Sequence, residues 1–206
     1  MHSYLNKMMK DLCCIGHITR DKIITPQSEV YMAGGTSFYM SRGMSQLPHN
    51  VNYELVTKVG QGQMPEVEKL RQRDIEVRCF ESRHTVYFEN RYGIDTNART
   101  QRVLAKADPF TLDEMRPLEA KVFHLGTLLS DDFAPEVVKH LSTKGKISID
   151  AQGYLREVVG EQVHAIDWKD KEAVLAYTDI LKLNEHEMRV ITNSDDPRTV
   201  ARQLAD

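Results

Sequence analysis

The stretch that decides the fold is residues 32–43, with the sequence MAGGTSFYMSRG. Its adjacent glycines, Gly34 and Gly35, let the backbone turn through positive φ angles and approach a ligand closely, and Thr36 or Ser37 is expected to cap the helix that starts there. The unpaired N–H groups of a helix start attract anions and hydroxyl groups. A tight turn alone would also explain the two glycines, so the flanking segments decide between a structural and a binding role.

Short apolar segments lie on both sides of this glycine pair. Residues 12–18 form a continuous apolar run, which is typical of a central strand buried on both faces, and Asp21 lies just past its end. Residues 53–59 form a second apolar run, which ends next to Gly60. Ligand groups in an open α/β sheet lie beyond the carboxyl ends of the strands, so Asp21 is a candidate binding residue. A solvated turn aspartate is the alternative.

The order and spacing of these segments resemble the start of the ribokinase-like (pfkB-type) carbohydrate kinases. That family has a strand with G-x-x-x-x-D, then a Gly-Gly helix start, then a strand ending in K-V-G, and the chain matches these at residues 16–21, 34–35 and 58–60. The likeness continues in HLGT from residue 124, ISIDAQ from residue 147 and LKLNEHE from residue 181. It therefore runs through the whole chain and implies an α/β fold with a doubly wound, mostly parallel sheet and a small β lid.

Periodicity and turn signals place the remaining elements in an α/β order. Residues 22–31 are expected to form a hairpin off the sheet, and the helix after the glycines is expected to reach about Leu47. Pro65 begins a helix, whereas the range 76–104 alternates with the period of a strand. Further strands are expected at 122–125, 147–150 and 180–183, and further helices at 112–115, 135–141, 171–177 and from Asn184 and Pro197.

A single ribokinase-like α/β domain over residues 1–206 is expected, with lid segments at about 22–32 and 76–104 inserted in it. By resemblance, these segments form a small sheet that covers the sugar and pairs with its copy in a homodimer; a surface meander is the alternative. The chain contains no G-A-G-D motif, which carries the catalytic base in the family. We therefore expect a truncated form that lacks the C-terminal part of the fold, has its base beyond Asp206 and is itself inactive.

Composition and charge limit the classes of partner. The chain has 206 residues, of which 41% are apolar and 28% charged, as is ordinary for a globular protein. Its 27 basic and 30 acidic residues give a net charge of −3, so there is no electrostatic reason to expect nucleic acid or an anionic membrane as partner. No apolar run has membrane-spanning length, and the first ten residues lack the apolar segment of a signal peptide. Three cysteines, two of them adjacent, favour a reducing, cytoplasmic location.

Asp21 is the strongest candidate for binding substrate. A carboxylate accepts hydrogen bonds from two hydroxyl groups at once, which suits the vicinal diol of a sugar or polyol. By resemblance, Asp21 matches the sugar-binding aspartate of the family, and Gly34 and Gly35 offer backbone N–H groups to the same ligand.

Other positions assigned to the substrate site differ from the ribose-specific members of the family. Thr19 and Tyr39 stand where asparagine is common, and Gly126 stands where those members have glutamate. These differences argue against ribose as the substrate. The helix start and the segment RVLAKADP at 102–109 are more similar to the myo-inositol kinase branch.

Asn184 and Glu187 form an N-x-x-E motif where a strand ends and a helix begins. The same spacing is that of a capping box, which is the structural alternative. In the family this motif helps to organise Mg²⁺ and the phosphates, so the resemblance implies ATP and Mg²⁺ as cofactors, with Glu187 reaching the metal through water. A hard cation that keeps several waters suits one carboxylate and one amide. Lys58 and Arg156 are lesser candidates near the site, with a solvated surface charge as the alternative.

The leading hypothesis is an ATP- and Mg²⁺-dependent kinase that phosphorylates a hydroxyl group of a sugar, polyol or nucleoside, with the catalytic base outside this chain. The alternative is a non-catalytic sugar- or nucleotide-sensing module on the same fold. A Rossmann-type dinucleotide enzyme is disfavoured because no G-x-G-x-x-G follows the first strand, where Gly16 stands alone. Turnover by this chain would make Asp21 and Asp150 the first candidates for the base.

Overall fold

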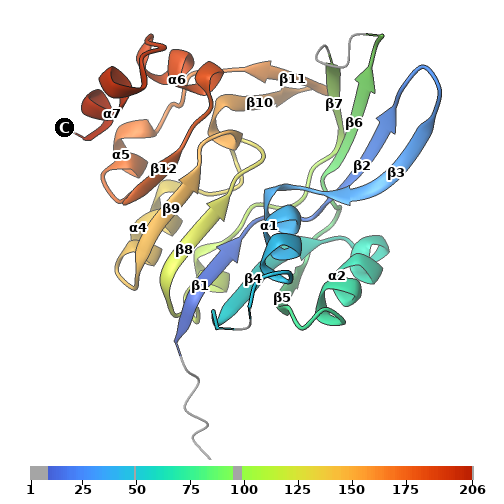
Figure 1. The fold of residues 1–206 in the computed structure, drawn as a ribbon, viewed down its shortest axis with the longest axis horizontal. Coiled ribbons are helices and arrows are strands. Elements are labelled where there is room, and N and C mark those ends of the chain that lie inside the picture. Colours follow the sequence, from blue (N-terminus) through green and yellow to red (C-terminus); the bar gives the residue numbers. More distant parts are fainter. Residues whose placement is uncertain (1–8, 49, 95–98, 206) are drawn as a thin grey trace, which may run out of the picture.

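The computed structural model of the chain describes residues 9–48, 50–94 and 99–205, and it contains two six-stranded β-sheets (Figure 1). The first sheet consists of β1 (Lys10–Ile15), β4 (Tyr53–Val59), β5 (Glu76–Glu81), β8 (Ala120–Gly126), β9 (Lys146–Asp150) and β12 (Ile180–Lys182). The second consists of β2 (Thr19–Ile24), β3 (Glu29–Gly34), β6 (Tyr87–Tyr92), β7 (Arg99–Ala105), β10 (Arg156–Val159) and β11 (Gln162–Ala165). The α-helices are α1 (Thr36–Met44), α2 (Met64–Arg71), α3 (Leu112–Met115), α4 (Pro135–Ser142), α5 (Lys171–Leu175), α6 (Glu185–Thr192) and α7 (Pro197–Ala205).

The two sheets differ in strand direction. The first has the order β12-β9-β8-β1-β4-β5, and each pair of neighbours is parallel. The second has the order β10-β11-β7-β6-β2-β3 and is antiparallel except between β2 and β6. The predicted α/β fold with a mostly parallel sheet is therefore confirmed.

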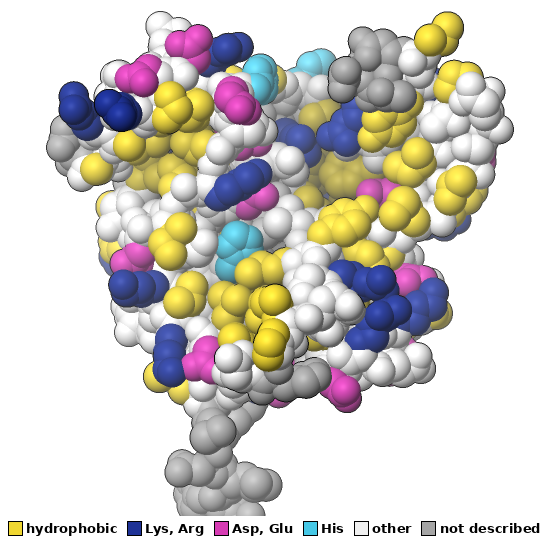
Figure 2. Space-filling model, viewed as in Figure 1, with side chains coloured by type: hydrophobic (Ala, Val, Ile, Leu, Met, Phe, Trp, Pro, Cys, Tyr) yellow, Lys and Arg dark blue, Asp and Glu magenta, His cyan; other side chains and the backbone are white. Residues whose placement is uncertain are grey.

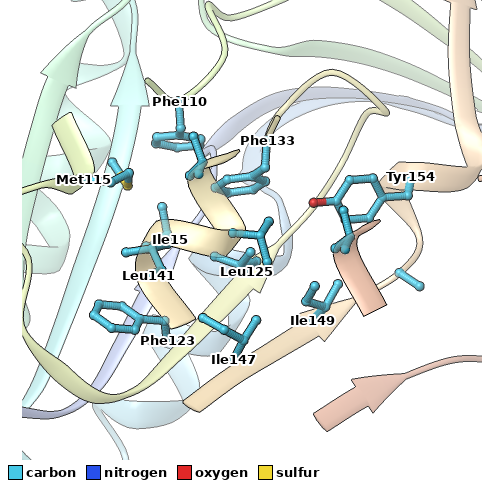
Figure 3. Close-up of a cluster of buried hydrophobic side chains, with 14 of the residues drawn as sticks. Ile15, Phe110, Met115, Phe123, Leu125, Phe133, Leu141, Ile147, Ile149 and Tyr154 are labelled. Carbon is cyan, nitrogen blue, oxygen red and sulfur yellow. The ribbon is translucent and has the colours of Figure 1, made fainter. Parts of the chain in front are cut away.

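Helices cover both faces of the first sheet, so that every residue of β4, between β1 and β5, is buried. On one face, α1 and α2 pack on β1 and β4 in a cluster that includes Leu55 and Leu70. On the other face, α3, α4 and α5 enclose a larger cluster, in which Phe123 of β8 lies near Leu141 of α4, with Phe133 towards the carboxyl end of the strands (Figure 3). Connection of parallel strands by helices that pack on the sheet produces this doubly wound arrangement.

Most predicted elements are present, with bounds shifted by a few residues. β4 occupies the predicted range 53–59, and α3 occupies 112–115. The helix after the glycine pair ends at Met44 rather than near Leu47. The hairpin begins at Thr19, earlier than predicted, so Asp21 lies inside β2 rather than in a turn beyond the first strand.

The range 76–104 contains strands of both sheets. β5 is an edge strand of the first sheet, parallel to β4, and only β6 and β7 join the hairpin β2–β3; residues 95–98 lie outside the described ranges. A strand-period pattern does not distinguish the two sheets, which is why the predicted lid segment begins too early. The hairpin β10–β11 was not predicted, and it extends the second sheet next to β7.

Two further expectations concern the absence of a membrane-spanning segment and the state of the cysteines. Within the described ranges, no helix is long and apolar enough to cross a membrane. Cys13, Cys14 and Cys79 are free thiols, and burial raises the pKa of Cys14 to about 12, so its thiol stays protonated and unreactive at neutral pH. The first eight residues and Asp206 lie outside the described part of the chain.

Candidate functional site

The candidate site lies where the order of the first sheet reverses. The chain passes from β1 to β4 and β5 on one side and later builds β8, β9 and β12 on the other. The carboxyl ends of β1 and β8 therefore border the crevice in which sheets of this kind bind ligands. The start of α1 and the second sheet both lie at this end of the strands (Figure 1).

Gly35 makes the sharp turn from β3 into α1. It is the N-cap residue with φ 93° and ψ 150°, a conformation that is essentially restricted to glycine. A Cβ atom at this position would lie 2.5 Å from the carbonyl oxygen of His17. The predicted capping by Thr36 or Ser37 is wrong, because Ser37 Oγ donates to the His17 carbonyl at 2.9 Å and Thr36 Oγ1 donates to Asp150 at 3.5 Å. The first turn of α1 therefore has no side-chain cap.

Asp21 is held between the two strands of the hairpin β2–β3. Thr19 Oγ1 donates to Asp21 Oδ1 at 2.6 Å, and the other oxygen, Oδ2, occupies the space that a Cβ atom at Gly34 would fill. Burial raises the pKa of Asp21, and this effect is opposed by the hydrogen bond from Thr19 and by the positive charge of Arg99. The structure thus brings together three of the predicted substrate residues, with the absent side chain of Gly34 making room for the carboxylate.

The other two predicted substrate positions are Tyr39, within α1, and Gly126, at the end of β8. Partial burial raises the pKa of Tyr39, as do the negative charge of Asp21 and the nearby Tyr92, so Tyr39 lies within electrostatic range of Asp21. Gly126 lies behind the helix: a Cβ atom there would be 3.3 Å from Thr36 Cβ. Gly126 therefore lets α1 pack closely on β8, and a contact with substrate stays a prediction.

Asn184 and Glu187 form a complete capping box at the start of α6. Asn184 Oδ1 accepts from the Glu187 N–H at 2.9 Å, while Glu187 Oε2 accepts from the Asn184 N–H at 2.8 Å and Oε1 accepts from Asn184 Nδ2 at 2.7 Å. The side chain of Glu187 is buried, and each of its oxygens keeps one free lone pair. Within the described ranges no group of three His, Cys, Asp or Glu side chains is placed to hold a metal ion. A contact of Glu187 with Mg²⁺ through water stays a prediction.

A recess of about 720 Å³ opens between α6 and the second sheet. Its lining includes Arg99, Gln152, Arg156, Asn184 and Glu187. Burial lowers the pKa of Arg156, and the positive charge of Arg99 lowers it further, against the opposing charges of Glu187 and Asp150. The recess therefore places two guanidinium groups, those of Arg99 and Arg156, near the buried carboxylate of the capping box.

Sequence reasoning recognised this recess only in part. Arg156 was a lesser candidate and lines the recess, whereas Lys58, the other one, is buried and bound to Glu114 at 2.8 Å and to the Pro109 carbonyl at 2.9 Å. Arg99 was missed. Its alternating, strand-like segment contains another arginine, Arg102, and no local signal separates the two.

Asp150, at the carboxyl end of β9, has partners that limit its use as a base. Lys182 Nζ donates to it at 3.0 Å, and Thr36 Oγ1 lies 3.5 Å away. Burial lowers the pKa of the neighbouring His124, whose Nδ1 lies 3.0 Å from Ser148 Oγ. Asp150 thus ties the start of α1 to β12.

The sequence matches no protein-family model, and a search of curated proteins finds no match. Solved structures do match. A pyrophosphate-dependent kinase in the ribokinase family, in complex with a pyrophosphate analogue and myo-inositol, is 28% identical with a TM-score of 0.83, over 94% of this chain and 68% of that one. A pyrophosphate-dependent myo-inositol-1 kinase converted into a myo-inositol-3 kinase is 25% identical with a TM-score of 0.83, over 94% and 66%. Phosphofructokinase-2 from Escherichia coli, in a tetrameric inhibited form, is 15% identical with a TM-score of 0.63, over 96% and 70%.

The fold is thus that of the ribokinase-like kinases, and the predicted resemblance to this family is confirmed. Pyrophosphate-dependent kinases of this family, one solved with myo-inositol, are the particular proteins to which the chain is similar at 25% to 28% identity. The chain spans about two thirds of the length of these structures. A carbohydrate kinase is the class of function that this likeness supports.

Proposed function

We propose that this chain binds the acceptor in a kinase that phosphorylates a hydroxyl group of a sugar, polyol or nucleoside, with a polyol such as myo-inositol as the preferred acceptor. The observation that carries the proposal is Asp21, whose carboxylate is oriented by Thr19 and seated over Gly34 beside the start of α1. An oriented, half-buried carboxylate binds vicinal hydroxyl groups strongly. The likeness to a kinase solved with myo-inositol supports a polyol over ribose.

The phosphoryl donor is either ATP, as the sequence resemblance implies, or inorganic pyrophosphate. A sugar kinase from Pyrococcus horikoshii was solved with ATP, but at 18% identity it supports the fold alone. The structures at 27% and 28% identity are pyrophosphate-dependent, and this favours pyrophosphate. Bound Mg²⁺ would neutralise the negative charge on the phosphate that is transferred. In this chain Glu187 is the residue that would reach the metal, through water.

The second sheet is the candidate for excluding water from the site. We propose that it acts as a lid, because excluding water protects the phosphoryl group from hydrolysis. Its edge strand β3 exposes Val30, Tyr31 and Met32, an apolar edge suited to pairing with a second copy in a homodimer. The base predicted beyond Asp206 and the cytoplasmic location stay predictions.

Binding of small molecules by the chain tests this proposal directly. Saturation-transfer NMR with myo-inositol, ribose, fructose and adenosine detects weak binding, and we expect myo-inositol to bind and ribose to bind less well. No binding by any of the four would contradict the proposal. Consumption of ATP or pyrophosphate by the same sample then separates the two hypotheses. Turnover identifies a kinase. Binding without turnover, both by this chain and by a longer gene product, identifies a sensing module.

Polyol binding is expected to weaken as the pH falls. Ionised Asp21 accepts the hydroxyl hydrogen bonds, and because burial raises its pKa, protonation begins at a higher pH than for an exposed aspartate with its ordinary value of 3.8. Affinity is therefore full above the raised pKa and is lost as the pH falls through it. Titrations with myo-inositol between about pH 4 and pH 8 check this. An affinity that does not change over this range would show that the carboxylate does not bind the polyol.

A further inference from the structure

A buried histidine and a buried aspartate face each other beneath the second sheet. His17 lies between β1 and β2 and is fully buried, and Asp132 follows β8 and is 4% exposed. His17 Nε2 lies 3.6 Å from Asp132 Oδ1 and has no hydrogen-bond partner within the described ranges. On the face drawn in Figure 2, by contrast, Lys and Arg side chains lie at the surface, many of them beside Asp or Glu. Ionisable groups are seldom fully buried unless they are paired.

The other ring nitrogen of His17 determines the protonation state of the imidazole. Nδ1 lies 3.2 Å from the carbonyl oxygen of Lys58, and because a carbonyl group only accepts, Nδ1 carries a hydrogen. A neutral ring would then have its lone pair on Nε2, facing the Asp132 carboxylate, and two acceptors repel each other in a buried space. A second hydrogen, on Nε2, turns this contact into attraction between an imidazolium and a carboxylate.

Asp132 has the hydrogen-bond partners of an ionised carboxylate. Its Oδ2 accepts from the N–H group of Leu128 at 2.7 Å and from that of Leu129 at 3.1 Å. Burial raises the pKa of Asp132, and the positive charge of His17 and these two N–H donors oppose this effect. Hydrogen bonds to the charged form favour that form, so the carboxylate stays ionised and the proton lies on the imidazole.

Other ionisable groups around the pair do not replace the imidazolium. Asp131 is negative and raises the pKa of Asp132 further, and the buried phenol of Tyr154 has its pKa raised by burial and by the charge of Asp132. Lys58, whose carbonyl accepts from the imidazole, has its own charge bound to Glu114 at 2.8 Å. The imidazolium is therefore the positive charge that faces this carboxylate.

On one side, the pair is connected to the hairpin β2–β3. His17 precedes by two residues Thr19, whose hydroxyl group orients Asp21. The carbonyl oxygen of His17 accepts from Ser37 Oγ of α1 at 2.9 Å. A fixed imidazole therefore fixes the backbone from which both the hairpin and the start of α1 are held.

On the other side, the pair is connected to the loop that follows β8. Asp132 binds the backbone of Leu128 and Leu129, and the side chains of these two leucines pack against Phe88 of β6. Phe88 is the residue that pairs with Asp21 in the register of β2 and β6. The strand that carries Asp21 is thus supported from both ends of the buried pair.

We propose that His17 and Asp132 form a buried ion pair that positions the acceptor-binding carboxylate of Asp21. The pair takes up one proton when the chain folds, and it holds the base of the hairpin β2–β3 against the loop after β8. Neither residue contacts substrate, so both are positioning residues. The positioning role rests on the proposed function, whereas the ion pair itself depends on no ligand.

The pH dependence of stability tests the proton of the pair. Above about pH 7 an unfolded chain has released this proton and the folded pair keeps it, so stability falls as the pH rises. In Asp132→Asn the amide oxygen accepts from the two N–H groups and the NH₂ group donates to Nε2, so no proton is needed. The folding constant of the wild type, divided by that of Asp132→Asn, should fall about tenfold for each pH unit between about pH 7 and pH 9. Urea denaturation measures both constants.

Asp113→Asn is the matched control for this comparison. Asp113 is an exposed aspartate paired with Arg116, so its replacement should keep the pH dependence of the wild type. Equal pH dependence of the wild type and Asp132→Asn would overturn the ion pair.

Rescue by asparagine tests the positioning role. Asp132→Ala leaves the N–H groups of Leu128 and Leu129 without their acceptor and should weaken myo-inositol binding about tenfold or more. Asp132→Asn keeps these hydrogen bonds and should bind myo-inositol as the wild type does at neutral pH. Unchanged affinity in Asp132→Ala, or an equal loss in both variants, would overturn the positioning role. Thermal melting checks that each variant is folded.

NMR of the wild-type chain with ¹⁵N-labelled histidine tests the ion pair even if both variants unfold. We expect one of the eight histidines to carry slowly exchanging hydrogens on both ring nitrogens at about pH 8, where exposed histidines have lost the second hydrogen. The absence of such a histidine would overturn the ion pair. No binding of any polyol by the wild type would overturn the proposed function together with the positioning role, and the ion pair would still be decided by the denaturation and NMR measurements.

Discussion

Replacing Asp21 with asparagine is expected to weaken myo-inositol binding about 100-fold while the chain stays folded. The carboxylate accepts at both oxygens, and Thr19 occupies one of them at 2.6 Å. In the asparagine variant the amide oxygen takes the Thr19 hydrogen bond, so an NH₂ group faces the ligand and cannot accept from a hydroxyl. Loss of hydrogen bonds to a charged acceptor costs about 3 kcal/mol, which is about 100-fold in affinity.

The Asp21→Asn experiment has a matched control in Asp131→Asn. Asp131 is an exposed aspartate whose partner is Lys106 rather than a residue of the hairpin, so its replacement should leave polyol affinity unchanged. Burial raises the pKa of Asp21, which means that folding disfavours its charge; removing that charge should therefore leave the melting temperature unchanged or slightly higher. An NMR titration that shows less than a threefold loss, on the order of 0.6 kcal/mol, would remove Asp21 from the acceptor site.

Replacing Gly35 with alanine is expected to lower the free energy of unfolding by about 3 kcal/mol. Two costs contribute to this loss. The backbone at φ 93° and ψ 150° is strained for any residue with a Cβ atom, and that atom would lie 2.5 Å from the carbonyl oxygen of His17, which is part of a fixed backbone. Relief of the clash would move the start of α1 away from the ends of β1 and β8, so myo-inositol binding should be lost as well.

Gly43→Ala provides the control for Gly35→Ala within the same helix. No atom lies within 4 Å of a Cβ added at Gly43, so alanine there should raise stability by about 0.5–1 kcal/mol through its better helix propensity. Urea denaturation of both variants gives the comparison. A loss below about 1 kcal/mol for Gly35→Ala would show that the turn from β3 into α1 rearranges at low cost.

The parts of the fold that were predictable have strong local signals. β4 has four apolar or aromatic residues, Tyr53, Leu55, Val56 and Val59, next to Gly60, and α3 begins with the capping box of Thr111 and Glu114. The sequence of β5 also alternates as in a strand, but this pattern does not predict which strand β5 pairs with. That choice depends on how α2 returns the chain to the edge of the first sheet, which is a property of tertiary packing.

The candidate site shows the same division between local and tertiary information. Thr19, Asp21 and Gly34 meet because hairpin pairing aligns Thr19 with Gly34. The sequence grouped them only through the resemblance to the family, because their spacing alone also fits a turn. The spacing of Asn184 and Glu187 is the same for a capping box and for a ligand motif, and only the hydrogen bonds of the structure establish the capping box. Arg99 reaches the recess through the packing of β7 near α6, which no sequence spacing contains.

The second sheet is assembled from three separate hairpins, β2–β3, β6–β7 and β10–β11, and the chain returns to the first sheet after each of them. Neither sheet is thus a continuous piece of polypeptide, and no single cut yields one without the other. To exchange the acceptor preference of two relatives by moving the whole second sheet, all three hairpins would have to be transplanted together. The hairpin β2–β3 alone carries Thr19, Asp21 and Gly34, so it is the smallest segment whose transfer would move the acceptor-binding carboxylate intact.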